Sequence, residues 1–522
     1  IGVRLVGSEM CIRDRWMPLR IVCRRYRPSL VSSRLMALYA VWFILALCLV
    51  LVPSRIGRRA AAPAIAFVLL VLLGFHLADL AVEAAYGRAF NPFVDGHLAE
   101  AGARLLAGML GLPLLLVVIL AGIVAPVSVF LLLWAVLSAA TRYAAPTCRV
   151  RAVAALAALG ATLALFLMPG GAAAIGTRLA ELSAFRAEMT AFDAASRDTG
   201  QFDTAALDGL ERRDVILVFV ESYGRASFDN PRYAAAHDGI RAAAQAAGEA
   251  AGIAMMSGWL TAPISGGQSW LAHATLAFGL RIGDQWRYER LFAGDRQSLF
   301  QIAAQAGYHT AAYMPAITMP WPESRRIGFD RLFASDDLGY EGQSFNWVTM
   351  PDQFTLEAFE RISGGLPGPR FSQIVLISSH APFTPIAPIL PREDIGDGRI
   401  FDRWANSGDP PDIVWRDPER VRDQYRDALG YSLSVAFAFA RRQAQQGRLV
   451  IVVGDHAPAG FISQIDSMDV PMHVFGPDHL LARMSAWRWA PGLRPDPAQT
   501  AWPMEAFRDR FIAAFGMRKG AS

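Results

Sequence analysis

Long apolar runs dominate the first third of this chain and limit what it can fold into. Four of them, at residues 35–52, 62–81, 105–140 and 152–168, are close to or beyond the length that spans a bilayer. A membrane-crossing helix needs about 20 apolar residues, and a buried helix of a soluble protein rarely needs so many. The sequence therefore predicts an N-terminal multi-span α-helical membrane domain.

The arginines around these runs predict their orientation. Clusters precede the first and the last run: Arg20, Arg24, Arg25, Arg27 and Arg34, then Arg142, Arg149 and Arg151. Basic loops stay on the cytoplasmic side. Both clusters can be cytoplasmic only if residues 105–140 cross twice, with a break near Gly122 and Pro126. This predicts five spans and an extracytoplasmic C-terminal half, although the basic residues 55, 58 and 59 keep a four-span alternative open.

Composition divides the rest of the chain. Residues 1–16 resemble a translated sequencing adapter and are left out of the fold; residues 17–170 form the membrane domain, and the polar residues 171–212 a juxtamembrane helix and linker. Residues 213–522 are then expected to form a separate C-terminal domain. No cysteine follows Cys148, which excludes a disulfide or a cysteine nucleophile there. The net charge of +4 gives no ground for nucleic-acid binding.

The C-terminal half has the pattern of an α/β domain. Continuous apolar runs, as in buried parallel strands, occupy residues 215–220, 308–314, 371–379, 448–454 and 470–477. Helical patterns separate several of them, at residues 298–306 and 421–443. Strands that alternate with helices predict a mostly parallel central sheet covered on both faces. In such sheets, ligands bind beyond the carboxyl ends of the strands.

Chemically active side chains follow three of these predicted strands. Glu221 comes directly after the first, His380 after the third, and the pair Asp455 and His456 after the fourth. Carboxylates and imidazoles are ligands of Zn²⁺, Mn²⁺ and Mg²⁺. One such residue alone is more often a cap or a packing residue, but their gathering at one sheet edge predicts a divalent metal site.

Ser269 is the candidate nucleophile. It stands in Gly-Gly-Gln-Ser before a helical apolar pattern, which places it at or near a helix N-terminus, where anions are stabilised. A hydroxyl next to a metal ion becomes a stronger nucleophile. Helix capping is the plainer interpretation of Ser269, and Ser265 is a second candidate in the same segment.

Taken in order, the segments VESYG, GGQS, SSHAPF and GDHAP resemble one known family. Over roughly residues 210–480 the chain is similar to the extracytoplasmic sulfatase-like domain of lipoteichoic acid synthases, within the alkaline phosphatase superfamily. Phosphoglycerol transferases and phosphoethanolamine transferases share the pattern. The resemblance implies an alkaline-phosphatase-like α/β fold. It also implies one divalent metal ion held by Glu221, Asp455 and His456, with Ser269 as nucleophile and further ligand.

The resemblance also implies substrate contacts and a reaction. His380 matches a histidine that contacts the phosphate or the leaving group, and Trp321 and Arg325 loosely match headgroup contacts with a different spacing. The implied enzyme moves a phospho-alcohol headgroup from a membrane phospholipid donor to an envelope glycan or lipid acceptor through a phospho-serine. A formylglycine sulfatase needs Cys/Ser-x-Pro-x-Arg, whereas the segment after Ser269 has neither the proline nor the arginine. A phosphate- or sulfate-ester hydrolase and an inactive binding domain remain the alternatives.

Overall fold

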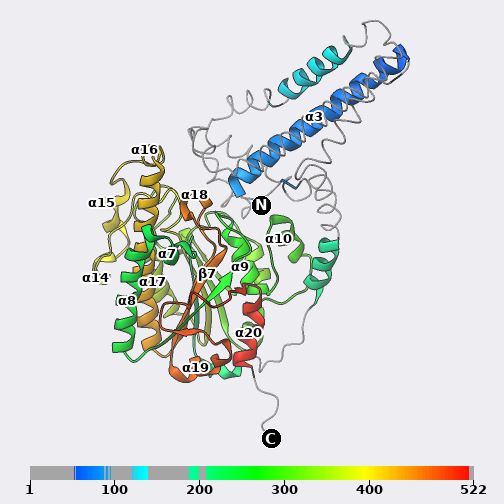
Figure 1. Cartoon of the computed structure of the whole chain (residues 1–522). Coiled ribbons are helices and arrows are strands. Elements are labelled where there is room, and N and C mark those ends of the chain that lie inside the picture. The colour runs from blue at the N-terminus through cyan, green and yellow to red at the C-terminus, as the bar shows by residue number, and fades with distance from the viewer. Residues whose placement is uncertain are drawn as a thin grey trace. The chain divides into compact units, whose positions relative to one another are not determined.

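The computed structural model of the chain describes residues 54–86, 124–138, 187–198 and 207–516, together with the isolated positions 52, 90, 91, 95, 120 and 122. By its contacts, the chain divides into one unit of residues 15–191 and another that contains residues 192–522. Figure 1 shows the elements of both units. The predicted adapter segment, the apolar run 35–52 except for position 52, and the run 152–168 lie outside the described residues.

In the first unit, the second apolar run forms a long helix, α3 (Arg55–Tyr86). Its segment Arg59–Leu80 is the one stretch in the described residues that is long and apolar enough to cross a membrane. Residues Val124–Ser138, inside the third predicted run, form a shorter apolar helix. One spanning helix does not distinguish four spans from five, so the topology remains a prediction.

A mixed, mostly parallel sheet of nine strands forms the centre of the second unit, in the order β4-β3-β5-β1-β6-β7-β2-β8, with β9 paired to β2. The strands are β1 (Val215–Val220), β2 (Ala254–Thr261), β3 (His309–Met314), β4 (Arg331–Ala334), β5 (Arg370–Leu376), β6 (Leu449–Gly454), β7 (Asp469–Gly476), β8 (Ala490–Pro491) and β9 (Trp502–Pro503). The five strands β4, β3, β5, β1 and β6 run parallel. The predicted mostly parallel sheet is therefore confirmed.

The sequence pattern predicted neither the antiparallel direction of β7 nor the strands β2, β4, β8 and β9. Strand β7 runs antiparallel to β6, because the connection between them contains only the short helix α18 (Gly460–Ser463), too little for a parallel crossover. Strand β2 was not predicted at all. Its sequence, AMMSGWLT, has a single β-branched residue, and it becomes a strand because it pairs with β7 along its whole length.

Helices cover both faces of the sheet (Figure 1). The helices with their bounds are α7 (Ala226–Asp229), α8 (Pro231–Ala250), α9 (Ser269–Phe278), α10 (Gln285–Leu291), α11 (Leu299–Gln305), α12 (Glu323–Ile327), α13 (Asp352–Ser363), α14 (Arg392–Ile395), α15 (Asp402–Ala405), α16 (Pro411–Val414), α17 (Pro418–Gln445), α19 (Asp478–Arg483) and α20 (Ala506–Phe515). Helices α8, α13 and α17 lie on one face, and α9, α11 and α20 on the other. The apolar strands are thus buried on both sides, as their uninterrupted β-branched runs predict.

Candidate metal centre and active site

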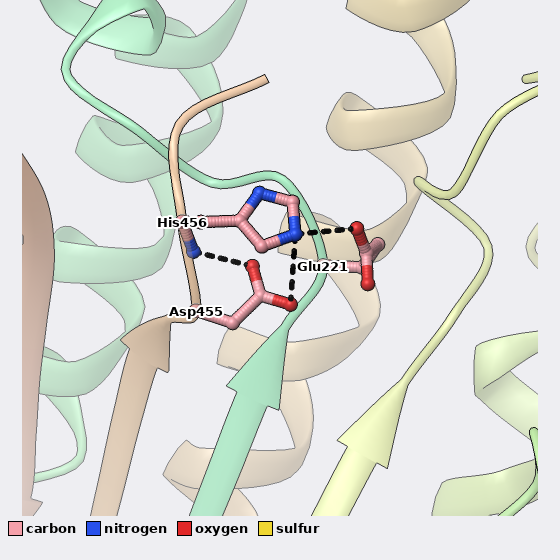
Figure 2. A group of neighbouring side chains, drawn as sticks. All are labelled: Glu221, Asp455 and His456. Carbon is pink, nitrogen blue, oxygen red and sulfur yellow. Dashed lines mark hydrogen bonds and ion pairs between the residues drawn. The ribbon is translucent and has the colours of Figure 1, made fainter. Parts of the chain in front are cut away.

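Three ionisable side chains meet where the paired strands β1 and β6 end. Val220 and Gly454 are partners in the parallel register, so the next residues, Glu221 and Asp455, emerge side by side, with His456 following. The ligand atoms of these three residues all lie within 4.8 Å of one another. Figure 2 shows the imidazole facing both carboxylates. Glu221, Asp455 and His456 are 4%, 0% and 1% exposed, and groups buried so deeply need a compensating charge.

The hydrogen bonds of this cluster fit a bound divalent cation. Asp455 Oδ1 accepts from the backbone N–H groups of Ser222 (2.9 Å) and His456 (2.6 Å). Its other oxygen, Oδ2, is buried and accepts no hydrogen bond from the described residues. The Nδ1 atom of His456 lies 2.9 Å from the carbonyl oxygen of Ala457, a contact that turns Nε2 towards Glu221 Oε1 at 3.2 Å. An orphaned carboxylate oxygen beside a second carboxylate and an imidazole nitrogen is the donor set of a metal site.

The pKa shifts of these three side chains also favour a bound cation. Burial and the neighbouring charge of Glu221 raise the pKa of Asp455 to about 8. Burial also disfavours a charged imidazole, but Asp455 and Glu221 outweigh it and raise the pKa of His456 to about 9. Burial likewise opposes ionisation of Glu221, yet the charges of His456 and His380 hold the pKa of this carboxyl below its usual range. The two buried carboxylates therefore need a compensating positive charge, which a divalent cation held by Glu221, Asp455 and His456 would supply.

Ser269 is the first residue of α9, and its hydroxyl reaches the same cluster. Its Oγ donates to Glu221 Oε2 at 2.8 Å and lies 3.2 Å from His456 Nε2. The preceding turn places it there. Gly267 has a φ of 138°, a conformation that only glycine adopts readily. The N–H of Gly266 donates to Ala457 O at 2.8 Å, which ties the turn to the segment after His456.

His380 lies on the turn that follows β5 and is 7% exposed. Its Nδ1 is 2.8 Å from Ala381 O, and the ring of Trp347 stacks on the imidazole with centroids 3.7 Å apart and 12° between planes. Burial lowers the pKa of His380, and this favours the neutral ring. His380 and Ser269 line the same cavity, which extends from the metal cluster between α9 and the sheet.

Asp352, at the start of α13, holds the turn before His380 in place. Its Oδ1 accepts from the N–H groups of Ile377 (2.6 Å) and Ser378 (2.8 Å), and its Oδ2 accepts from the Ser432 hydroxyl (2.6 Å). The carboxyl is fully buried, and burial raises its pKa. We therefore assign Asp352 a positioning role, exerted through the backbone of residues 377–380.

Replacing Asp352 with alanine is expected to lower the free energy of unfolding by about 2–4 kcal/mol, because three buried donors lose their acceptor. Turnover should fall as well, since the His380 turn loosens. Asp352→Asn is the matched control: its carbonyl oxygen can still accept both N–H groups, so most stability and turnover should remain. Thermal denaturation and steady-state rates measure both effects. If alanine and asparagine behaved alike, the hydrogen-bonding role would be wrong.

The structure places only one of the two predicted headgroup-contact residues, Trp321 and Arg325, at the cavity. Trp321 lines the cavity and is 7% exposed, whereas Arg325, on α12, is exposed and not among the lining residues. His273 also lines the cavity. Trp347 and Asp352 were missed. Nothing in their local sequence marks them, because a loop and a distant helix bring them to the His380 turn.

This arrangement is that of an α/β enzyme domain whose polar site lies at the carboxyl edge of a mostly parallel sheet, with a hydroxyl at a helix start beside a buried Glu/Asp/His cluster. Residues 213–469 match the family model described as Sulfatase. The second unit therefore contains a sulfatase-family domain of the alkaline phosphatase superfamily. No curated protein sequence matches the chain.

Several solved structures are similar to the chain at low identity. The lipoteichoic acid synthase LtaP from Listeria monocytogenes is 13% identical, with 63% of this chain and 78% of that one covered and a TM-score of 0.38. The Streptococcus pyogenes phosphoglycerol transferase GacH is 11% identical, with coverage of 63% and 90% and a TM-score of 0.35. The periplasmic domain of phosphoethanolamine transferase EptC from Campylobacter jejuni is 8% identical, with coverage of 58% and 89% and a TM-score of 0.37.

Proposed function

We propose that the protein is a membrane-anchored, metal-dependent transferase that moves a phospho-alcohol headgroup through a covalent phospho-serine at Ser269. One observation carries this proposal: the Ser269 hydroxyl, at a helix start, is hydrogen-bonded to Glu221 and lies within 3.2 Å of His456. A hydroxyl that only capped its helix would accept from backbone N–H groups of the first turn. Ser269 instead directs its proton into the buried ionisable cluster.

The sequence around Ser269 favours an unmodified hydroxyl as nucleophile. Formylglycine formation needs proline and arginine two and four residues after the modified position, where this chain has Leu271 and His273. Leu271 is buried in α9, and His273 packs against Phe219 with ring centroids 4.1 Å apart. Both residues therefore have packing roles, and no formylglycine signal remains.

The reaction we propose has two half-reactions. In the first, Ser269 Oγ gives up the proton that it donates to Glu221 and forms a bond to phosphorus, the bond from phosphorus to the donor's alcohol oxygen breaks, and the donor alcohol leaves with a proton from His380; Oγ regains its proton when the second half-reaction frees it. In the second, an acceptor hydroxyl attacks the same phosphorus and the bond to Oγ breaks, which regenerates Ser269. If water is the acceptor, the same residues make a hydrolase.

The metal would be held by Glu221, Asp455 and His456, with Ser269 Oγ as a further ligand. When bound, a divalent ion lowers the pKa of a hydroxyl and neutralises the charge that develops on phosphate oxygens. Carboxylate and imidazole donors suit Mn²⁺, Mg²⁺ or Zn²⁺.

His380 is the residue we assign to proton transfer at the ester oxygen. Its Nδ1 is engaged with Ala381 O, so Nε2 is the atom left to face a substrate. Burial lowers the pKa of His380, while the negative charge of Glu221 opposes this shift, as an anionic substrate also would. With the anionic substrate bound, the ring takes a proton on Nε2; His380 gives this proton to the leaving oxygen in the first half-reaction and takes one from the acceptor in the second.

We further propose a multi-pass location in the plasma membrane with the catalytic domain outside the cytoplasm, a phospholipid as donor, and an envelope glycan or lipid as acceptor. The apolar segment Arg59–Leu80 and the basic loops of the sequence support this orientation. A periplasm-specific reporter fused after Ser522 is expected to be active, and one fused near Arg142 inactive. The reverse pattern would refute the orientation.

The function is tested by incubating the purified, Mn²⁺-loaded protein with bacterial phospholipids that carry radioactive phosphorus. Label should appear on the peptide that contains Ser269, and diacylglycerol should be released in equal amount. Added acceptor alcohol should then remove the label from the protein into a new ester. Loss of label to water alone would identify a hydrolase, and failure of any phosphorus compound to label the protein would refute the phospho-serine.

A further inference from the structure

The cavity beside Ser269 has mostly apolar walls. It lies between α9 on one side and the ends of β3 and β5 on the other. Its volume is about 60 Å³. One water needs roughly 10–15 Å³ on this measure, so the space admits a group of several atoms. Its apolar walls include Ala274, Ala277, Met314, Ile317, Phe329 and Val375.

Besides Glu221, Ser269 and His380, the polar side-chain atoms of the described residues that line the cavity belong to Gln268, His273, Gln373 and the indoles of three tryptophans, of which Trp321 has its buried N–H unpaired. Burial lowers the pKa of His273 to about 3, so its ring is uncharged, and its Nε2 has no hydrogen-bond partner among the described residues. Gln373 is 2% exposed, and its amide nitrogen contacts the sulfur of Met314 at 3.6 Å. Among the residues that the structure describes, no aspartate, lysine or arginine lines the cavity, and Glu221, at the metal cluster, is its one carboxylate.

We propose that this cavity takes an apolar, uncharged organic substituent of the phosphoester, an alkyl chain in its simplest form, rather than a glycerol or ethanolamine group. The inference rests on the proposed phosphoryl chemistry at Ser269 and specifies its substrate class.

The apolar walls favour some substituents over others, because each substituent loses its hydration when it enters the cavity. An ethanolammonium group would lose its hydration without gaining a counter-ion, and burial of an unpaired charge is strongly unfavourable. A glycerol group would have to satisfy two hydroxyls within largely apolar walls, where the nearest polar partners are the His273 ring, the Trp321 indole N–H and an amide already facing a thioether. An alkyl group requires no partner and gains free energy with each methylene that it buries. Among esters whose phosphate binds at Ser269 in the same way, the ester with the apolar substituent should therefore bind most tightly.

The test measures binding by calorimetry to the Mn²⁺-loaded full-length protein in detergent. The probes are inorganic phosphate and two pairs of monoesters matched in non-hydrogen atoms: pentyl phosphate with glycerol 1-phosphate, and propyl phosphate with 2-aminoethyl phosphate. Pentyl phosphate is expected to bind at least about tenfold more tightly than glycerol 1-phosphate, and propyl phosphate more tightly than 2-aminoethyl phosphate. Equal affinities, or the opposite order in either pair, would overturn the inference.

A pair of variants ties the preference to the cavity. Ile317→Asn adds an amide to the wall, and the preference for pentyl phosphate should shrink to about threefold or less, with inorganic phosphate binding unchanged. Ile362→Asn, at an equally half-buried isoleucine outside the cavity, should keep the full preference. A preference that survives Ile317→Asn, or disappears in both variants, contradicts this site.

The two proposals fail separately in this design. If inorganic phosphate and the esters bind but show no order, only the cavity inference is wrong. If neither phosphate nor any ester binds the metal-loaded protein, the phosphoryl chemistry at Ser269 is wrong, and the cavity inference is refuted with it.

Discussion

Ser269→Ala is expected to lower turnover of a phosphodiester by at least about 10⁴-fold, because no group remains to accept the phosphoryl moiety covalently. The fold and the metal content should be retained, since Glu221, Asp455 and His456 come from other strand ends. Steady-state rates, metal analysis and thermal denaturation measure the three quantities. Mass spectrometry should find the phosphorus adduct of the wild-type peptide missing in the variant.

Two controls sharpen this experiment. Ser269→Thr should keep measurable turnover, because threonine supplies a hydroxyl at the same position. Ser265→Ala removes the other serine of the segment, whose backbone pairs with Ala457 but whose hydroxyl is not bonded to the cluster, and should stay near wild type. A formylglycine at position 269, or sulfate-ester turnover far above phosphodiester turnover, would instead establish the sulfatase alternative.

Asp455→Asn is expected to reduce turnover by at least about 1000-fold and to weaken metal binding, because it removes one of two ligand charges without changing side-chain size. The backbone bonds from Ser222 and His456 to Oδ1 can persist in the variant, so the fold should survive. Exhaustive chelation of the wild-type protein should have the same effect, and added Mn²⁺ should restore activity. Bound metal is counted by mass spectrometry on dialysed protein.

A matched substitution separates a ligand effect from a change in net charge. Asp330→Asn removes the same charge at an exposed aspartate before β4, at the opposite edge of the sheet, where Oδ2 accepts from Thr310 N. It should leave both turnover and metal content unaltered. Full turnover of a chelated protein that holds no metal would show that the ligand assignment is wrong.

Several parts of the site can be predicted from sequence because they follow from local rules. Continuous β-branched runs define β1 and β6, so Glu221 and Asp455 can be placed at strand ends without a structure. The glycines before Ser269 and the apolar helix after it predict a hydroxyl at a helix start, which is where α9 begins. These signals are local because backbone conformation depends mainly on nearby residues.

Tertiary structure alone decided which of these side chains meet. The parallel register of Val220 with Gly454 brings two carboxylates together, and no local pattern encodes strand order. The long-range contacts of Trp347 and Asp352 with the His380 turn likewise appear only after folding. The apolar cavity is assembled from α9, α12, β3, β5 and several loops, and the sequence of each of these segments is that of an ordinary core segment. The physical reason is the same throughout: the sequence determines which side chains are apolar, charged or nucleophilic, but packing between distant segments determines which become neighbours and which space stays open between them.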